Sequence, residues 1–132
     1  MINKQQIFDW SVRVYYEDTD PAGIVYYANY LKFIERARTE WLRQNGIDLD
    51  VLAQQDKMFF VIQSVQIDYL TPARFNDLLT VSSQVLFLGK ASLKMQQNIS
   101  NDTGQVCCKA VVKLACVDTV KLRPRRFPAT LF

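Results

Sequence analysis

One stretch of the sequence decides the fold class: YLKFIERARTEWLRQN, residues 30–45. Its apolar side chains recur every three or four residues, which is the spacing of one face of an α-helix. These apolar positions are Leu31, Ile34, Ala37, Trp41 and Leu42. Charged side chains occupy much of the remaining surface, at Lys32, Glu35, Arg36, Arg38, Glu40 and Arg43. The stretch therefore predicts an amphipathic helix of roughly 24 Å, which ends near Gly46. Arg36 and Glu40 are four residues apart, so we expect them to pair.

The segments on both sides of this helix follow a different period. Residues 7–17 are rich in β-branched and aromatic side chains, which predicts a strand. After a short helical turn at about 49–55, apolar and polar residues alternate in four further segments. Their apolar faces hold Val61, Val65, Ile67 and Tyr69; then Leu79, Val81, Val85 and Phe87; then Ala91, Leu93, Met95 and Ile99; then Val106, Cys108, Ala110, Val112, Leu114 and Cys116. Alternation of this kind is typical of strands.

Short connections join these strands, with tight turns at 89–90 and 101–104. Short links favour antiparallel neighbours, and one helix is long enough to cover one face of the sheet. The sequence of 132 residues contains no internal repeat and no linker. We therefore expect residues 1–132 to form a single α+β domain, with an irregular tail from Lys121 onward.

The composition excludes several classes of function. Apolar residues make up 49% and charged residues 22% of the chain, a globular balance that excludes a disordered protein. No histidine is present, which excludes a Ser-His-Asp triad, a Cys-His pair and a histidine-ligated zinc site. The three cysteines match no metal motif, so we expect buried thiols in a reducing cytoplasm.

Charge and hydropathy exclude other partners. The net charge of +3 does not favour nucleic acid, which usually binds to a more basic domain. No apolar run approaches the ~18 residues of a membrane span. Residues 1–6 do not have the pattern of a secretory signal.

The densest group of unusual residues precedes the helix, in DTDPAGIVYYANY, residues 18–30. Two carboxylates, Asp18 and Asp20, stand two residues apart in a turn, and Gly23 allows close approach of the backbone. The N–H groups at a helix start lack internal acceptors and can hold an oxyanion that develops on a carbonyl. The segment therefore has the parts for hydrolysing an activated acyl group. The alternative is that both carboxylates only cap the turn and the helix.

Three runs within this region resemble hotdog-fold acyl-CoA thioesterases: VRVYYEDTD (12–20), GIVY (23–26) and ERARTE (35–40). The resemblance is to the tol-pal-associated, or YbgC-like, acyl-CoA thioesterases, and it extends through residues 67–69 and 115–118. Residues 20–30 are also similar to the 4-hydroxybenzoyl-CoA thioesterases. The resemblance implies a hotdog fold, in which an antiparallel sheet of about five strands wraps around one long central helix.

The resemblance also implies roles for individual residues. Asp20 would be the catalytic carboxylate, as nucleophile on the thioester or as base toward water, and Asp18 would be structural. The backbone N–H of Tyr27 would polarise the thioester carbonyl. Lys90 would meet the CoA phosphates, and Gly23 and Tyr26 would complete the substrate-binding set.

This sequence departs from the YbgC-like pattern at one position of the site. Related proteins of that branch usually carry histidine where this chain has Tyr27, whereas the aromatic branch carries tyrosine there. The backbone role of Tyr27 is unaffected, but an imidazole is excluded. Short-chain, aromatic and long-chain acyl groups therefore all stay open as substrates.

The resemblance further implies a cytoplasmic hydrolase that needs no metal and no bound cofactor, because coenzyme A is part of its substrate. Such chains form homodimers with the active sites at the interface, and often homotetramers, and acyl carrier protein is a further candidate partner. The competing function is a non-hydrolytic module that binds acyl-CoA or acyl carrier protein, or that scaffolds enzymes of envelope or lipid synthesis.

Other charged residues are weaker candidates for a functional role. We expect Glu35 and Glu40 on a solvated or ion-paired helix face. The four cations of the tail are expected in solvent, with a nucleotide phosphate or an anionic lipid surface as the alternative ligand. They are Lys121, Arg123, Arg125 and Arg126.

Overall fold

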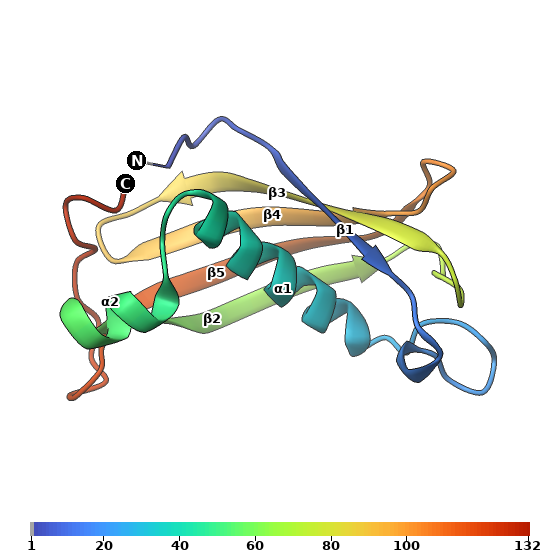
Figure 1. The fold of residues 1–132 in the computed structure, drawn as a ribbon, viewed down its shortest axis with the longest axis horizontal. Coiled ribbons are helices and arrows are strands. Elements are labelled where there is room, and N and C mark those ends of the chain that lie inside the picture. Colours follow the sequence, from blue (N-terminus) through green and yellow to red (C-terminus); the bar gives the residue numbers. More distant parts are fainter. Residues whose placement is uncertain (1) are drawn as a thin grey trace.

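A computed structural model describes residues 2–132 as one antiparallel sheet with a helix lying across one of its faces (Figure 1). The elements in chain order are β1 (Phe8–Arg13), the 3₁₀ turn η1 (Tyr16–Asp18), α1 (Asn29–Gln44), α2 (Leu49–Gln55), β2 (Met58–Tyr69), β3 (Leu78–Leu88), β4 (Ser92–Ser100) and β5 (Val106–Asp118). The strands lie in the order β1-β3-β4-β5-β2. The predicted α+β class, with five strands and one long helix, is confirmed.

Helix α1 forms and ends as the sequence predicts, within one residue at each end. It presses Phe33, Ala37 and Trp41 against the sheet, and each of these is at most 3% exposed. Gly46 ends it in the left-handed region, at φ +77°, where its N–H donates to the carbonyl of Arg43 at 3.0 Å. The helix is therefore held mainly by its buried face, since a short helix in isolation is marginal.

One charged residue of α1 is not where the charge pattern places it. Arg38 was expected on the solvated side, but its side chain is only 8% exposed. The reason is its spacing: Arg38 stands four residues after Ile34 and four before Leu42, on the buried stripe. Leu31, expected in the core, is instead 41% exposed.

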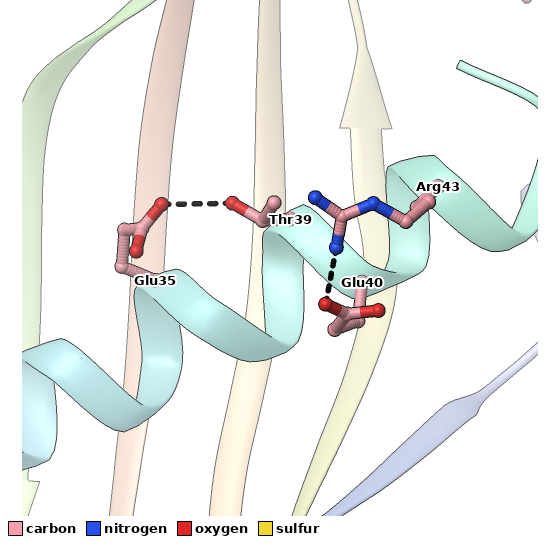
Figure 2. A network of polar contacts seen from close by, with 4 residues as sticks. All are labelled: Glu35, Thr39, Glu40 and Arg43. Atoms are coloured by element: carbon pink, nitrogen blue, oxygen red, sulfur yellow. Dashed lines mark hydrogen bonds and ion pairs between the residues drawn. The ribbon is translucent and has the colours of Figure 1, made fainter. Parts of the chain in front are cut away.

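The polar contacts along α1 also differ from the prediction. Glu40 forms its ion pair with Arg43 rather than with Arg36, and Glu35 accepts a hydrogen bond from the Thr39 hydroxyl at 2.8 Å (Figure 2). Three and four residues are both neighbouring positions on a helix, so either partner was available to Glu40. The pair is exposed and contributes little to stability.

The first strand is shorter than predicted, because β1 ends at Arg13 rather than at Glu17. A carboxylate oxygen of Asp18 accepts the N–H of Tyr15 at 2.8 Å, and the N–H of Asp18 donates to the Tyr15 carbonyl at 3.0 Å. These reciprocal bonds close η1 directly after the strand. Local side-chain bonds of this kind compete with strand continuation.

Two β-bulges change which side chains face the helix. In β2, Ile62 and Ser64 pair with consecutive residues of β5, so Gln63 is an extra residue. Ile62 therefore joins Val65 on the helix side, and the prediction that Val61 shares a face with Val65 is wrong. A second bulge in β3 places Phe87 opposite Lys94 on the outer face, where it is 57% exposed rather than buried.

Strands β1 and β2 are the two edges of the sheet. The two ends of the sheet carry different loops: the 18–28 loop and the start of α1 lie at one end, and the β3–β4 turn and the tail lie at the other (Figure 1). The tail is irregular as predicted. The three cysteine thiols are buried, and burial raises the pKa of Cys108 to about 12. Within residues 2–132, no helix combines the length and the apolar character that a membrane crossing requires.

Candidate active site

The loop between η1 and α1, residues 18–28, is closed by its own backbone. The N–H of Asp20 donates to the carbonyl of Ile24 at 2.9 Å, and the N–H of Tyr26 donates to that of Asp18 at 3.0 Å. The loop is also tied to the segment after β2, because the N–H of Val25 donates to the carbonyl of Ala73 at 2.8 Å. The residues that the sequence singles out therefore lie in an ordered segment.

The two aspartates of the loop accept hydrogen bonds from different backbone groups. Asp18 Oδ2 accepts the N–H of Tyr15 at 2.8 Å, and the Asp18 backbone carbonyl accepts from the Asn29 side chain at 2.9 Å. Asp20 Oδ1 accepts the N–H of Ala22 at 2.8 Å. The other oxygen of each carboxylate has no donor in residues 2–132, and both residues are half-buried. Asp18 therefore ties η1 to the end of β1, and Asp20 ties the tip of the loop, with one carboxylate oxygen left over in each.

Gly23 stands at the tip of this loop with φ +79°, a conformation that L side chains adopt only under strain. A Cβ built there would meet no atom of the chain within 4 Å, so packing inside the chain does not require glycine. The backbone conformation requires it, and it leaves the tip open to another molecule. Next to it, the Tyr26 side chain is 47% exposed and packs against Tyr27, with 4.9 Å between the ring centroids.

Tyr27 stands two residues before the first residue of α1, with the N-cap Ala28 between them. The backbone N–H of Tyr27 and that of Ala28 donate to no acceptor in residues 2–132. The carbonyl of Tyr27 accepts a hydrogen bond from the Tyr69 hydroxyl at 3.2 Å. That contact orients the peptide group between Tyr27 and Ala28, which carries the Ala28 N–H. Two free donors therefore stand at the positive end of the helix.

Tyr27 also lines a pocket of about 320 Å³. Its other walls include Tyr30, Tyr69 and residues 70–72. Asp20 does not line it in the isolated chain, although its loop neighbours Ile24 and Val25 do. Aliphatic and tyrosine side chains make up most of the walls, and ligand sites are commonly of this apolar kind with few polar groups.

Two of these tyrosines were not identified from the sequence as site residues. Tyr30 was placed in the helix, yet its hydroxyl accepts the N–H of Ala73 at 3.0 Å beneath the pocket. Tyr69 was placed in a strand, and only the end of β2 brings it to Tyr27. The available signal was the number of tyrosines near the loop in the sequence. That number does not by itself indicate that Tyr30 and Tyr69 lie close to Tyr27 in space.

These phenols are poor candidates for a catalytic base. Burial raises the pKa of Tyr30 and of Tyr69 above the ordinary value of 10.0. A hydrogen bond with Tyr27 raises the pKa of Tyr26. A phenol with a raised pKa stays protonated near neutral pH, so it can donate a hydrogen bond but cannot readily take a proton. Among the predicted site residues, Asp20 is the one with base chemistry at neutral pH.

Lys90 is not brought to this loop within one chain. It lies in the turn between β3 and β4, where its carbonyl accepts the N–H of Phe127 at 2.9 Å. The 18–28 loop lies at the opposite end of β3, where Ile24 bridges Arg74. A strand of 11 residues separates the two ends by about 35 Å. Lys90 instead lies close to the basic tail.

A metal site is not evident in this part of the molecule. No group of three or more cysteine, aspartate or glutamate side chains with the geometry to hold a metal ion occurs in residues 2–132. The chemistry available at the loop is that of carboxylates and of the free N–H groups of Tyr27 and Ala28 before the helix.

Comparison with known proteins gives the same family by three routes. The family model described as the thioesterase-like superfamily matches residues 14–131. An acyl-CoA thioesterase YbgC from Haemophilus influenzae is 43% identical over 121 residues, which is 92% of this chain and 88% of that protein. An acyl-CoA thioester hydrolase YbgC from Escherichia coli is 38% identical over 125 residues, 95% of this chain and 92% of that protein.

A solved structure agrees with the sequence relatives. The probable thioesterase from Bartonella henselae superposes with a TM-score of 0.88 at 35% identity, covering 93% of this chain and 100% of that one.

Proposed function

The chain belongs to the thioesterase-like superfamily, and we propose that it hydrolyses the thioester of an acyl-CoA, releasing coenzyme A and a carboxylic acid. The observation that carries the proposal is the 18–28 loop, where Asp20 Oδ2 and the N–H of Tyr27 both lack partners in residues 2–132. One is a base or nucleophile, and the other is an oxyanion donor. Two near-full-length relatives have this activity in their names.

In the proposed reaction, the N–H of Tyr27 donates to the thioester carbonyl oxygen. Attack on the carbonyl carbon moves negative charge onto that oxygen, and the donor stabilises it. Collapse of the tetrahedral intermediate breaks the carbon–sulfur bond, and the thiolate of coenzyme A leaves and takes a proton. Gly23 lies at the tip of the loop and the Tyr26 side chain is exposed, and both are proposed to contact the substrate.

Asp20 has two proposed routes in this reaction. As a base, it takes a proton from water, and the hydroxide attacks the thioester. As a nucleophile, it forms an anhydride with the acyl group, which water then hydrolyses. A single turnover in heavy-oxygen water distinguishes them, because the nucleophilic route leaves heavy oxygen in the Asp20 carboxylate. No cofactor takes part in either route.

We propose that two copies of the chain build the complete site. β2 is an edge strand of 12 residues, and two of its own residues on the helix side, Ile62 and Val65, are 47% and 40% exposed. Long unprotected edges pair with other strands. Antiparallel pairing of β2 with a second β2 brings the Lys90 end of one chain beside the 18–28 loop of the other. Lys90 and the tail cations then meet the phosphates of coenzyme A in trans.

The primary test is a thiol-release assay over a panel of short-chain, aromatic and long-chain acyl-CoAs. We expect turnover for at least one class, and its loss in Asp20→Asn. Acyl carrier protein carrying the same acyl groups belongs in the panel, because it presents the same thioester. A wild-type protein that binds acyl-CoA without releasing thiol would contradict the proposal. Light scattering of the same sample checks the proposed dimer or tetramer, and cell fractionation checks the proposed cytoplasmic location.

A further inference from the structure

Tyr69 stands at the end of β2, where the sheet holds it on one side and two pocket side chains on the other. The N–H groups of the next two residues both donate to the carbonyl of Cys107 in β5, at 2.8 and 3.3 Å, so the end of the strand is anchored. The ring of Tyr69 packs edge-on against Tyr27 with 6.1 Å between the centroids, and its centroid lies 5.6 Å from that of Tyr30. The side chain of Tyr69 is therefore fixed relative to the site loop.

The Tyr69 hydroxyl has one partner in residues 2–132, the carbonyl of Tyr27, to which it donates at 3.2 Å. Burial raises the pKa of Tyr69, so the hydroxyl keeps its proton and can donate near neutral pH. Tyr69 is nevertheless 45% exposed, and a hydrogen bond between groups that water can reach adds little to the stability of the fold. Its main consequence is that it fixes the direction of the Tyr27 carbonyl.

The carbonyl of Tyr27 belongs to the same peptide group as the N–H of Ala28. A peptide group is planar, with its N–H opposite its carbonyl, so a bond that fixes the carbonyl also fixes the N–H. A hydrogen bond accepted by the carbonyl further polarises the group and makes its N–H a stronger donor. The N–H of Ala28 has no acceptor in residues 2–132. Tyr69 therefore aims a free donor through one rigid peptide group.

The N–H groups of Tyr27 and Ala28 stand in one turn. The N–H of Asn29 donates to the carbonyl of Tyr26 at 2.8 Å, which closes the turn with Tyr27 and Ala28 at its centre. Ala28 has helical backbone angles, φ −69° and ψ −22°. Successive N–H groups at a helix start point in the same direction, out of the helix. One oxygen placed before α1 can therefore accept from both groups.

We propose that Tyr69 is a positioning residue for the reaction, whose hydroxyl holds the peptide between Tyr27 and Ala28 so that both N–H groups bind the oxyanion. The inference rests on the proposed function. As the thioester carbon becomes tetrahedral, its oxygen gains negative charge and accepts from the N–H of Ala28 as well as from that of Tyr27. The Tyr69 hydroxyl stays on the Tyr27 carbonyl, keeps its proton and does not touch the substrate oxygen.

The first experiment removes this hydroxyl and keeps the ring. In Tyr69→Phe, kcat for the best acyl-CoA should fall about tenfold, which is the scale of one lost hydrogen bond. KM should stay within about twofold, because the contact acts only when charge develops on the oxygen. Tyr16→Phe is the matched control: Tyr16 is 81% exposed and lies outside the pocket and the 18–28 loop. It should leave kcat and KM unchanged.

A pair of coenzyme A ketones tests the same inference without turnover. S-trifluoroacetonyl-CoA adds water or a carboxylate at its carbonyl and becomes tetrahedral, whereas S-acetonyl-CoA stays trigonal. The wild type should bind the fluorinated ketone more tightly. In Tyr69→Phe, this preference should fall about tenfold, with the affinity for S-acetonyl-CoA unchanged, because only the tetrahedral form carries the developed charge. Titration calorimetry measures both affinities.

The amide of Ala28 can be observed on its own by magnetic resonance, because residues 27–28 are the one Tyr–Ala pair in the sequence. Carbon-13 at the tyrosine carbonyls and nitrogen-15 at the alanine amides together select this signal. S-trifluoroacetonyl-CoA should move the Ala28 amide proton downfield in the wild type, and by less in Tyr69→Phe. An unmoved signal in the wild-type complex would show that Ala28 is not a donor.

Two further results would overturn the inference and leave the proposed function intact. A folded Tyr69→Phe protein with the wild-type kcat would show that the hydroxyl does not position the site. A raised KM with unchanged kcat would make Tyr69 a wall of the pocket only. Failure of the wild type to release thiol from any acyl-CoA would instead contradict the proposed function. In that case, equal affinities of the wild type and Tyr69→Phe for S-trifluoroacetonyl-CoA would overturn the inference as well.

Discussion

The two ends of the sheet differ in charge and in construction. At one end, a loop closed by its own backbone holds Asp18 and Asp20 beside the free N–H of Tyr27. At the other, Lys90 lies in the β3–β4 turn, where its carbonyl accepts the N–H of Phe127 in the basic tail. Neither Lys90 nor the cations of the tail have an acidic partner within 4.0 Å in the described residues. A strand of about 35 Å separates the two ends. One end has the proposed reacting groups, and the other has cations of the kind that suit a phosphorylated substrate.

The difference supports the proposal that each chain contributes two half-sites, which are completed by a second copy. A thioester substrate with phosphates at its far end needs both sets of groups within the length of one molecule. Antiparallel pairing of two β2 edges brings unlike ends together, because a two-fold axis reverses the direction of the second chain. Each of the following predictions changes a residue at one of the two ends and measures the effect on turnover, KM or stability.

The largest effect is expected from Asp20→Asn. The amide keeps the shape and the acceptor for the Ala22 N–H, but it cannot act as nucleophile or base. Turnover of the best acyl-CoA should fall at least ~10²-fold, with the melting temperature nearly unchanged. A variant that retains more than about a tenth of wild-type turnover would show that the reacting carboxylate lies elsewhere.

The next prediction concerns the N–H of Tyr27, the proposed oxyanion donor at the same end of the sheet. Tyr27→Phe keeps the peptide N–H, so turnover should stay within a few-fold of the wild type. Tyr27→Pro removes the donor, and the loss should be roughly 10²-fold, as for removal of one oxyanion donor. Circular dichroism must show that the proline variant still folds. A fall of more than about 30-fold in Tyr27→Phe would favour a direct role for the hydroxyl instead.

Lys90 tests whether the two ends work in trans. Lys90→Glu should raise KM for acyl-CoA about tenfold while kcat changes little, because the lost contact is to a phosphate far from the reacting atoms. In a mixed dimer of Asp20→Asn and Lys90→Glu chains, sites shared between subunits give one intact site and one doubly altered site. Such a dimer should have about half of the wild-type kcat at the wild-type KM.

The same mixed dimer also gives the result that would contradict shared sites. If each site is built from one chain, every site carries one of the two changes. All remaining activity then shows the raised KM, and no fraction of the sample behaves as wild type. Tandem affinity tags on the two chains isolate the mixed species for this measurement.

The smallest effect is expected at Asp18, the neighbour of Asp20 in the loop. Asp18→Asn keeps an acceptor for the Tyr15 N–H, so turnover should change by no more than a few-fold. Asp18→Ala removes the acceptor and should lower the free energy of unfolding by about 1 kcal/mol, measured by urea denaturation. A loss of activity equal to that of Asp20→Asn would remove the distinction between the two carboxylates.

Much of the fold could be predicted because its signals are local. The spacing of Ile34, Trp41 and Leu42 depends only on the helix repeat, and the bounds of α2 and β3 match the alternation and turn residues in the sequence. The site loop was predictable for the same reason: Asp20, Gly23 and Tyr27 stand within eight residues of one another. Short-range sequence patterns predict the local structure correctly here because few long-range contacts oppose it.

Several of the departures involve contacts between segments far apart in the sequence. The bulge at Gln63 depends on how β2 aligns with β5, and it exchanged Val61 for Ile62 on the helix side. Tyr69 reaches Tyr27 across 42 residues of sequence, and Arg38 reaches Gln97 across 59. Arg38 was assigned to solvent by its charge, although its spacing from Ile34 was the better guide.

The sequence by itself determined the class of fold, the single long helix and the loop that holds the reacting groups, because helix and strand periods and turn residues act over a few neighbours. Only the tertiary structure decided that Lys90 lies at the far end of β3, that Tyr69 reaches Tyr27, and that Arg38 is buried beside Gln97. Those facts depend on strand register and on which hydrogen bonds close first. Both arise from the packing of distant segments, and no local pattern specifies them.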